Sequence, residues 1–136
     1  MRSKLSVLWL FAVLNYLYCD IVSLMDPELL PQFLAGHVEG TDISEGFLLG
    51  GSILIEIPIA MVVISKLVPQ HPVNRWANIG AGTIMTLAQT ATLFMGAPAT
   101  YYAFFSVIEI ATTAFIVWSA WRWRHEQTTA PQDALV

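Results

Sequence analysis

Four long apolar segments fill most of this chain and restrict it to a membrane fold. They cover residues 5–25, 43–68, 76–95 and 101–121 of the 136. A helix needs about 20 predominantly apolar residues to cross a hydrocarbon core of about 30 Å. Only 12% of the residues are charged, against roughly 25% in an average soluble domain. The sequence therefore predicts an all-α bundle of four transmembrane helices within residues 1–124. The polar residues 125–136 are expected to form a disordered tail.

The basic residues predict how this bundle is oriented. If the four segments cross the membrane in turn, all six basic residues fall on one side, namely Arg2, Lys4, Lys66, Arg75, Arg122 and Arg124. Lysine and arginine are enriched in cytoplasmic flanks of membrane helices. We therefore expect both termini, and the tail, in the cytoplasm.

The longest connection, on the opposite side, is predicted to contain a short helix at the membrane interface. Asp26, Pro27 and Glu28 resemble a helix start, because an N-cap acid precedes a proline at the first helical position. Pro31 interrupts this pattern and Gly36 is placed to end it, so the helix is expected to be brief or to restart midway. Further on, Asp42 stands three residues before Glu45, which suggests a capping box at the start of the second long helix.

Two glutamates, Glu56 and Glu109, lie alone in the middle of apolar segments. No lysine or arginine lies within nine residues of either. An ionisable residue at the centre of a membrane helix is costly, usually faces the bundle interior, and by default marks a candidate functional site. We therefore expect both glutamates to face one interior pocket.

Polar residues at helical spacing extend this hypothesis to the other helices. Asp20 follows Tyr16 by one turn, Glu56 follows Ser52 by one turn, and Thr86 and Gln89 share a face of the third helix. The predicted ligand or proton site, in the central-to-outer half of the bundle, comprises Glu56, Glu109, Asp20, Asn15, Tyr16, Gln89, Ser52 and Thr86. One alternative stays open. Because removal from water favours the neutral acid, each glutamate is also suited to a structural hydrogen bond between helices.

Small residues and one proline predict how the helices pack. Gly46 and Gly50 form a GxxxG pair, which permits close backbone approach. Packing within the monomer is favoured over dimerisation. Pro58, two residues after Glu56, removes a backbone donor and is expected to bend the second long helix.

Other kinds of chemistry have no support in the sequence. His37, His71 and His125 are scattered without metal-ligand spacing, and Cys19 is the only cysteine. No phosphate-binding loop, catalytic motif or basic stripe for nucleic acid is present. We therefore predict no metal, no cofactor and no nucleic-acid partner, and a non-enzymatic role is favoured.

The chain also resembles a known kind of protein. The resemblance rests on the segments MDPELLP, GFLLGGSILIEIPIAM, NRWANI and FFSVIEIA. These are similar to a family of small bacterial membrane proteins of unknown function with four helices, which share the layout of DoxX-like proteins. The resemblance implies a four-helix protein of the bacterial inner membrane and brings no catalytic residues. Small multidrug-resistance transporters are a second comparison, although their key glutamate lies in the first helix.

Three functions remain open at this point. The first is a carboxylate pocket that binds a small molecule, lipid or quinone-like ligand, or moves a proton with it. The second is a non-catalytic accessory subunit beside a larger membrane complex. The third is a dimeric drug-type transporter. The lipid bilayer is a partner in all three, and a homo-oligomer or another membrane protein is a further candidate partner.

Overall fold

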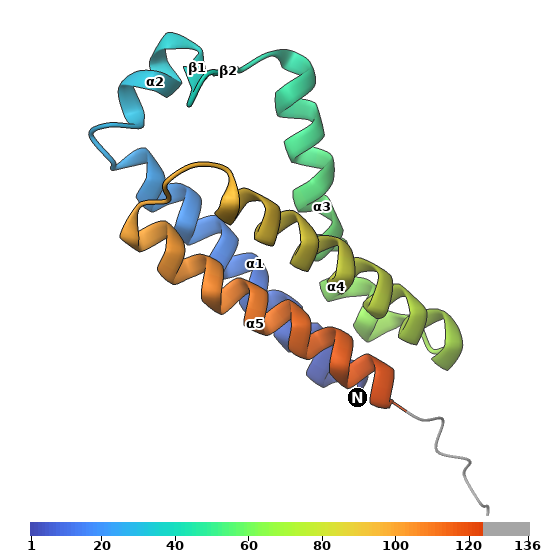
Figure 1. Cartoon of the computed structure of the whole chain (residues 1–136). Coiled ribbons are helices and arrows are strands. Elements are labelled where there is room, and N and C mark those ends of the chain that lie inside the picture. Colours follow the sequence, from blue (N-terminus) through green and yellow to red (C-terminus); the bar gives the residue numbers. More distant parts are fainter. Residues whose placement is uncertain (124–136) are drawn as a thin grey trace, which may run out of the picture.

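The computed structural model describes residues 1–123 and consists of four long helices and one folded connection. The long helices are α1 (Arg2–Leu24), α3 (Glu45–Leu67), α4 (His71–Phe94) and α5 (Thr100–Arg122). The connection between α1 and α3 holds α2 (Leu30–Ala35), β1 (His37–Val38) and β2 (Thr41–Asp42) (Figure 1). The predicted all-α fold with four long helices is confirmed. The predicted tail, residues 125–136, lies outside the described residues.

Three of the described helices, α1, α3 and α5, are long and apolar enough to cross a membrane. The fourth, α4, has 24 residues but is more polar, and it does not meet the same criterion. Its buried asparagines bond inside the protein, as described below, so its polarity reflects the interior of the bundle. Three candidate spans make this a multi-pass membrane protein.

The four long helices form a closed ring in which neighbours run in opposite directions. α1 packs against α3 and α5, and α4 packs against the same two helices. The N-terminus and the end of α5 therefore lie together at one end of the bundle (Figure 1). The apolar core at this end and along the axis includes Leu5, Trp9, Met85 and Ile116. We call the end with Met1 and Leu67 the basic end, and the end with Met25 and Glu45 the acidic end.

α3 is divided into two halves by Pro58. A proline inside a helix removes a backbone hydrogen bond and its ring clashes with the preceding turn. Toward the basic end Met61 and Ser65 are buried, whereas toward the acidic end every residue from Glu45 to Leu54 is exposed. Figure 1 shows this half of α3 diverging from the other three helices. The bend was predicted, but the separation of half a helix from the bundle was not.

Close helix contact occurs at a different glycine from those expected. A Cβ atom added at Gly50 would meet nothing within 4 Å, and one at Gly46 only the Ser44 hydroxyl at 3.8 Å. A Cβ at Gly82 would lie 2.7 Å from Cγ2 of Val117. The expectation that Gly46 and Gly50 pack within the monomer is therefore wrong for the described residues, because their half of α3 diverges. The α4–α5 seam depends on Gly82 instead.

The connection at the acidic end is tied to α5 through Asp26. This carboxylate accepts hydrogen bonds from the Glu28 backbone N–H at 2.8 Å and from the Tyr101 hydroxyl at 2.9 Å. The Glu28 N–H, followed by the Tyr101 hydroxyl, lowers the pKa of Asp26 below its usual value. The carboxylate therefore stays charged and bonded at neutral pH.

The predicted short helix is present, and it is brief and begins midway, at Leu30. α2 starts at Leu30 with Pro31 in its first turn, where a missing N–H costs nothing. It ends at Gly36, whose φ of 82° places it in the left-handed region that favours glycine. Pro31 thus lies where this helix begins.

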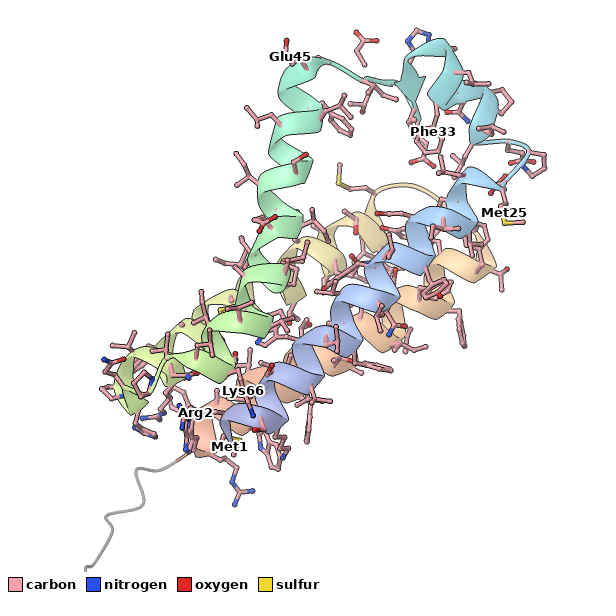
Figure 2. All side chains as sticks on the ribbon, turned by 180° about the vertical axis from the view of Figure 1, so that it is seen from behind. Met1, Arg2, Met25, Phe33, Glu45 and Lys66 are labelled. Atoms are coloured by element: carbon pink, nitrogen blue, oxygen red, sulfur yellow. The ribbon has the colours of Figure 1, made fainter. Side chains whose placement is uncertain are left out.

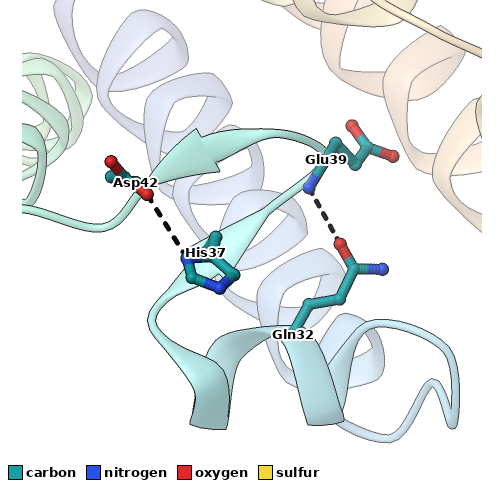
Figure 3. Close-up of polar contacts among 4 residues, drawn as sticks. All are labelled: Gln32, His37, Glu39 and Asp42. Atoms are coloured by element: carbon teal, nitrogen blue, oxygen red, sulfur yellow. Dashed lines mark hydrogen bonds and ion pairs between the residues drawn. The ribbon is translucent and has the colours of Figure 1, made fainter.

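A two-stranded hairpin follows α2 and was not predicted. β1 and β2 pair antiparallel, with His37 opposite Asp42. The turn residues Glu39 and Gly40 both have positive φ, 48° and 82°, as a type I′ turn requires. Gln32 accepts the Glu39 N–H at 2.8 Å, and His37 Nδ1 lies 3.3 Å from Asp42 Oδ1 (Figure 3). Glu-Gly is a weaker turn signal than Asn-Gly or Asp-Gly, which explains why the sequence did not reveal it.

The hairpin also changes the start of α3. Asp42 lies in β2, so it does not form the expected capping box with Glu45, and that prediction is wrong. The N-cap is Ser44, whose hydroxyl accepts the Phe47 N–H at 3.1 Å. A serine at this position satisfies one of the open donors of the first turn.

Candidate functional site

The buried carboxyl group of Glu109, on α5, is the centre of the candidate site. Its side chain is 1% exposed, and neither carboxyl oxygen has a hydrogen-bond partner among residues 1–123. Most buried polar groups in proteins are hydrogen-bonded, so each exception needs an explanation. An unpaired carboxyl inside a membrane bundle is such an exception.

α1 contributes three ionisable side chains within electrostatic reach of Glu109. The Tyr16 hydroxyl is also buried without a hydrogen-bond partner in the described chain, and it lies within electrostatic reach of Glu109. Cys19 and Asp20, about one turn further along, interact electrostatically with Glu109 as well. We call these four residues the Glu109 cluster. Cys19 was not among the predicted site residues, and its place in the cluster comes from the structure.

The seam between α4 and α5 flanks the Glu109 cluster with neutral hydrogen bonds. The Gln89 amide donates to the Ser106 hydroxyl at 2.9 Å, and the Thr86 and Thr113 hydroxyls share a bond of 2.7 Å. Thr113 also bonds the Glu109 backbone carbonyl at 3.0 Å. These side chains are satisfied by one another, so they position α5 and leave the Glu109 carboxyl unpaired.

The structure does not bring Glu56 to this cluster. Glu56 is exposed, whereas Pro58, only two residues on, is buried. Two residues correspond to about 200° of helix rotation, so Glu56 faces away from the bundle. Ser52 is also exposed, and its hydroxyl bonds the Leu48 carbonyl of its own helix at 2.8 Å. In this structure the expected pair of glutamates in one pocket is therefore not formed.

Of the remaining predicted site residues, some lie near Glu109 or in the adjacent seam and one does not. Tyr16 and Asp20 interact electrostatically with Glu109, although the Asp20 side chain is exposed, and Gln89 and Thr86 lie in the adjacent seam. Asn15 donates to the Phe11 carbonyl of its own helix at 2.8 Å and does not join the cluster through this bond. The helical period alone does not tell which of two neighbouring polar residues, Asn15 or Tyr16, faces the interior.

A second polar cluster, at the basic end, was missed by the sequence analysis. Trp9 Nε1 donates to Asn78 Oδ1 at 2.7 Å, and the Ser65 hydroxyl donates to the same oxygen at 3.0 Å. Asn78 Nδ2 donates to the carbonyl and side-chain oxygens of Asn74, both at 2.8 Å. These four residues are fully buried. They connect α1, α3 and α4.

Asn74 extends this cluster to the end of α3. Its amide donates to the carbonyls of Ser65 at 3.0 Å and Val68 at 2.8 Å. The last carbonyls of a helix lack partners within the helix, so Asn74 satisfies groups that would otherwise be open. The sequence feature that could have revealed this cluster is the spacing of Asn74 and Asn78, which are four residues apart in one helix. Because every amide finds a partner, this cluster is structural.

The basic residues gather at one end of the bundle through specific contacts. Arg75 donates to the carbonyls of Ala120 at 3.1 Å and Trp121 at 2.9 Å, at the C-terminus of α5. A cation is favourable there because the helix dipole is negative. Lys66 donates to the Ser3 hydroxyl, and Arg2 and Lys66 lie at the opposite end from Glu45 (Figure 2). Arg124 lies outside the described residues.

Within residues 1–123, no group of three or more histidine, cysteine, aspartate or glutamate side chains is suited to hold a metal ion. The fold and the unpaired carboxyl define a multi-pass helical membrane protein with a buried acid in its core. More particularly, the chain belongs to a family of unknown function, DUF6326, whose model matches residues 1–130. No curated protein and no solved structure matches the chain. The predicted membership of a family without an assigned function is thus confirmed, whereas the DoxX-like layout and the bacterial origin stay predictions.

Proposed function

We propose that this protein is an integral protein of the bacterial inner membrane that binds a small hydrogen-bonding ligand at the Glu109 cluster and exchanges a proton with it. The observation that supports this function is the buried Glu109 carboxyl without a hydrogen-bond partner in the described chain. The unpaired Tyr16 hydroxyl beside it supports the same conclusion. An ionisable residue inside a membrane bundle is a functional-site hypothesis by default.

A purely structural role for Glu109 is less well supported than a binding role. A structural carboxyl would form a hydrogen bond to a neighbouring helix. The buried polar groups at the basic end show that this chain can give such groups hydrogen-bond partners. The amides of Asn74 and Asn78 find partners inside the bundle, and Asn78 also accepts from the Trp9 indole and the Ser65 hydroxyl. Glu109 has serine and threonine neighbours in the same seam, but those hydroxyls bond elsewhere.

The chemistry of the cluster favours a particular class of ligand. A neutral carboxyl donates one hydrogen bond and accepts others, and a phenol does both. A ligand with hydroxyl groups, such as a quinol headgroup, satisfies both side chains. A cationic ligand would instead favour the carboxylate, so that binding would release the Glu109 proton to solvent. We favour the quinone-like class, because it partitions into the lipid that surrounds the helices.

The Glu109→Gln variant tests this function. An amide keeps much of the hydrogen bonding of a neutral acid but carries no exchangeable carboxyl proton, so we expect normal expression and folding. Protection against heat by a short-chain benzoquinol should be lost in the variant and retained in the native chain. The Glu56→Gln variant is the matched control, because the same change is made at a glutamate that faces away from the Glu109 cluster. It should keep full protection by the quinol.

Two outcomes would contradict this proposal. If the native chain gains no protection from the quinol but does from tetraphenylphosphonium, with proton release, the drug-type transporter gains support. If Glu109→Gln matches the native chain in every assay and only Glu109→Leu unfolds, Glu109 is structural.

We further propose that α4 crosses the membrane with the other three helices and that both termini are cytoplasmic. Contacts at the basic end support this arrangement. Lys66 bonds Ser3, and Arg75 bonds the end of α5, so α1, α3, α4 and α5 each have one terminus there. A helix of 24 residues that runs between the same two ends as three candidate spans crosses the same layer.

Reporter fusions at both termini should therefore give a cytoplasmic signal, since basic flanks are retained on that side. A cysteine at Gly40, in the Cys19→Ser background, should react with an impermeant thiol reagent added to intact cells. A cysteine at Gln70, in the short α3–α4 connection, is the control and should react only after lysis. A terminus found outside the cell would contradict the proposed topology.

A further inference from the structure

The position of Glu56 carries an inference about a partner of this protein. Glu56 lies at the middle of α3, 11 residues from Glu45 and 11 from Leu67. At 1.5 Å per residue, about 16 Å of helix separates it from either end. A glutamate side chain spans only a few ångströms, so its carboxyl cannot reach water from this depth. Exposure at mid-membrane is costly, and such residues normally face protein or a wet cavity.

The described chain itself does not cover Glu56. Ile59 and Val63, on the same outward face of α3, are exposed together with Glu56. The buried residues of α3, Pro58, Met61 and Ser65, lie on the opposite face. The half of α3 before Pro58, toward the acidic end, diverges from the bundle (Figure 1). Because residues 1–123 leave this carboxyl uncovered, we expect its cover to come from outside them.

The two residues four positions from Glu56 are small, whereas Ile53 and Ile59, three positions away, are large and exposed. Ser52 precedes it by four residues and Ala60 follows it by four, so all three share one face. The Ser52 hydroxyl is already bonded within its helix. Small residues let the backbones of two membrane helices approach closely. The face therefore presents a single carboxyl between two small residues, where a second helix can come near.

The chemistry of this face is complementary to itself. A neutral carboxyl has one donor and an acceptor, so two of them form a reciprocal pair that leaves neither unsatisfied. A two-fold interface places a residue near the axis against its own copy. The same basic flanks act on every copy, so all copies insert in the same direction and two α3 helices run parallel. A different protein would have to supply its own donor at the same depth.

We propose that a second copy of this chain binds the outward face of α3, with the two Glu56 carboxyl groups hydrogen-bonded to each other across a two-fold axis. Ser52 and Ala60 then lie at the contact of the two helices. The proposal does not depend on a ligand at Glu109, since the two glutamates face in different directions.

Disulfide formation between copies tests the geometry. In a Cys19→Ser background, Ser52→Cys should cross-link efficiently under mild oxidation in native membranes, because Ser52 would face its own copy. Val107→Cys is the matched control. Val107 is 62% exposed on α5, at a position away from both helix ends, but it would not face the second copy. It should cross-link only at the background rate.

Variants of Glu56 test the hydrogen bond. Hydrogen bonds between membrane helices contribute modestly, so Glu56→Leu should weaken the dimer by about 3- to 20-fold. Glu56→Gln should weaken it less, because an amide can pair with its own copy. Single-molecule photobleaching in dilute lipid bilayers measures both. Thermal unfolding of each variant shows whether the monomer is still folded.

Three results would overturn the proposal. One is single-step photobleaching of the native chain at every dilution. The second is equal cross-linking through Ser52→Cys and Val107→Cys, which would reflect random collision. The third is a folded Glu56→Leu variant that dimerises as well as the native chain. If a different membrane protein cross-links to Ser52→Cys while the chain stays monomeric, the accessory-subunit function is favoured instead.

Discussion

Replacing Asn78 with alanine should destabilise the native bundle by about 2–4 kcal/mol. Asn78 Oδ1 accepts from Trp9 at 2.7 Å and from Ser65 at 3.0 Å, and all three residues are fully buried. Alanine leaves the indole N–H and the serine hydroxyl without this acceptor, and an unsatisfied buried polar group costs about 1–3 kcal/mol. Reversible unfolding in mixed micelles measures the change.

The control for this prediction is Asn15→Ala. Asn15 bonds only the Phe11 carbonyl of its own helix among the described contacts, at 2.8 Å and in an exposed setting. Its loss should change the free energy of unfolding by no more than about 0.5 kcal/mol, as for most exposed substitutions. If Asn78→Ala and Asn15→Ala have the same small effect, the buried asparagine cluster does not hold α1, α3 and α4 together.

Replacing Gly82 with alanine should cost about 1–3 kcal/mol, the usual range for overpacking. The new methyl group would lie 2.7 Å from Cγ2 of Val117 and 3.3 Å from the Thr113 carbonyl oxygen. The carbonyl belongs to the backbone of α5 and cannot move aside alone, so α4 and α5 must separate. Thermal unfolding of the purified variant tests this.

Gly80→Ala is the matched control, two residues away on the same helix. A Cβ at Gly80 meets nothing within 4 Å, and alanine is favoured over glycine in helices by about 1 kcal/mol. This variant should therefore be neutral or more stable. Adding Val117→Ala to Gly82→Ala should restore part of the lost stability, because the closest contact is removed. Equal effects at Gly80 and Gly82 would show that the seam tolerates a methyl group.

The seam at Gly82 also bears on the proposed site. Thr113 links Gly82 to Glu109. Its backbone carbonyl lies close to Gly82, and its hydroxyl bonds Thr86 and the Glu109 carbonyl. A wider seam would displace the turn of α5 that carries Glu109. Ligand protection should therefore weaken in Gly82→Ala even where the variant remains folded.

The number of long helices and the approximate position of each could be predicted from the sequence, because apolar length and basic flanks are local properties. The sequence also identified Glu109 as a site candidate, since a lone acid in an apolar segment is visible without a structure. The bend at Pro58 followed from the chemistry of proline. The short helix after Asp26 followed from its start and stop signals, although Pro31 and not Pro27 lies in its first turn.

Which side chains face the interior depends on how the four helices pack together. Glu56 and Glu109 have similar apolar neighbours in sequence, yet Glu109 is buried and Glu56 is exposed. The difference arises because Pro58 directs half of α3 away from the bundle, and because Glu56 lies about 200° around the helix from the buried Pro58. The partners of Asn74 and Asn78 could not be predicted from the sequence either, since Trp9 is 69 residues away from Asn78 in the chain. Helical spacing shows which side chains share one side of a helix. Packing against the other helices decides which of these sides faces the interior.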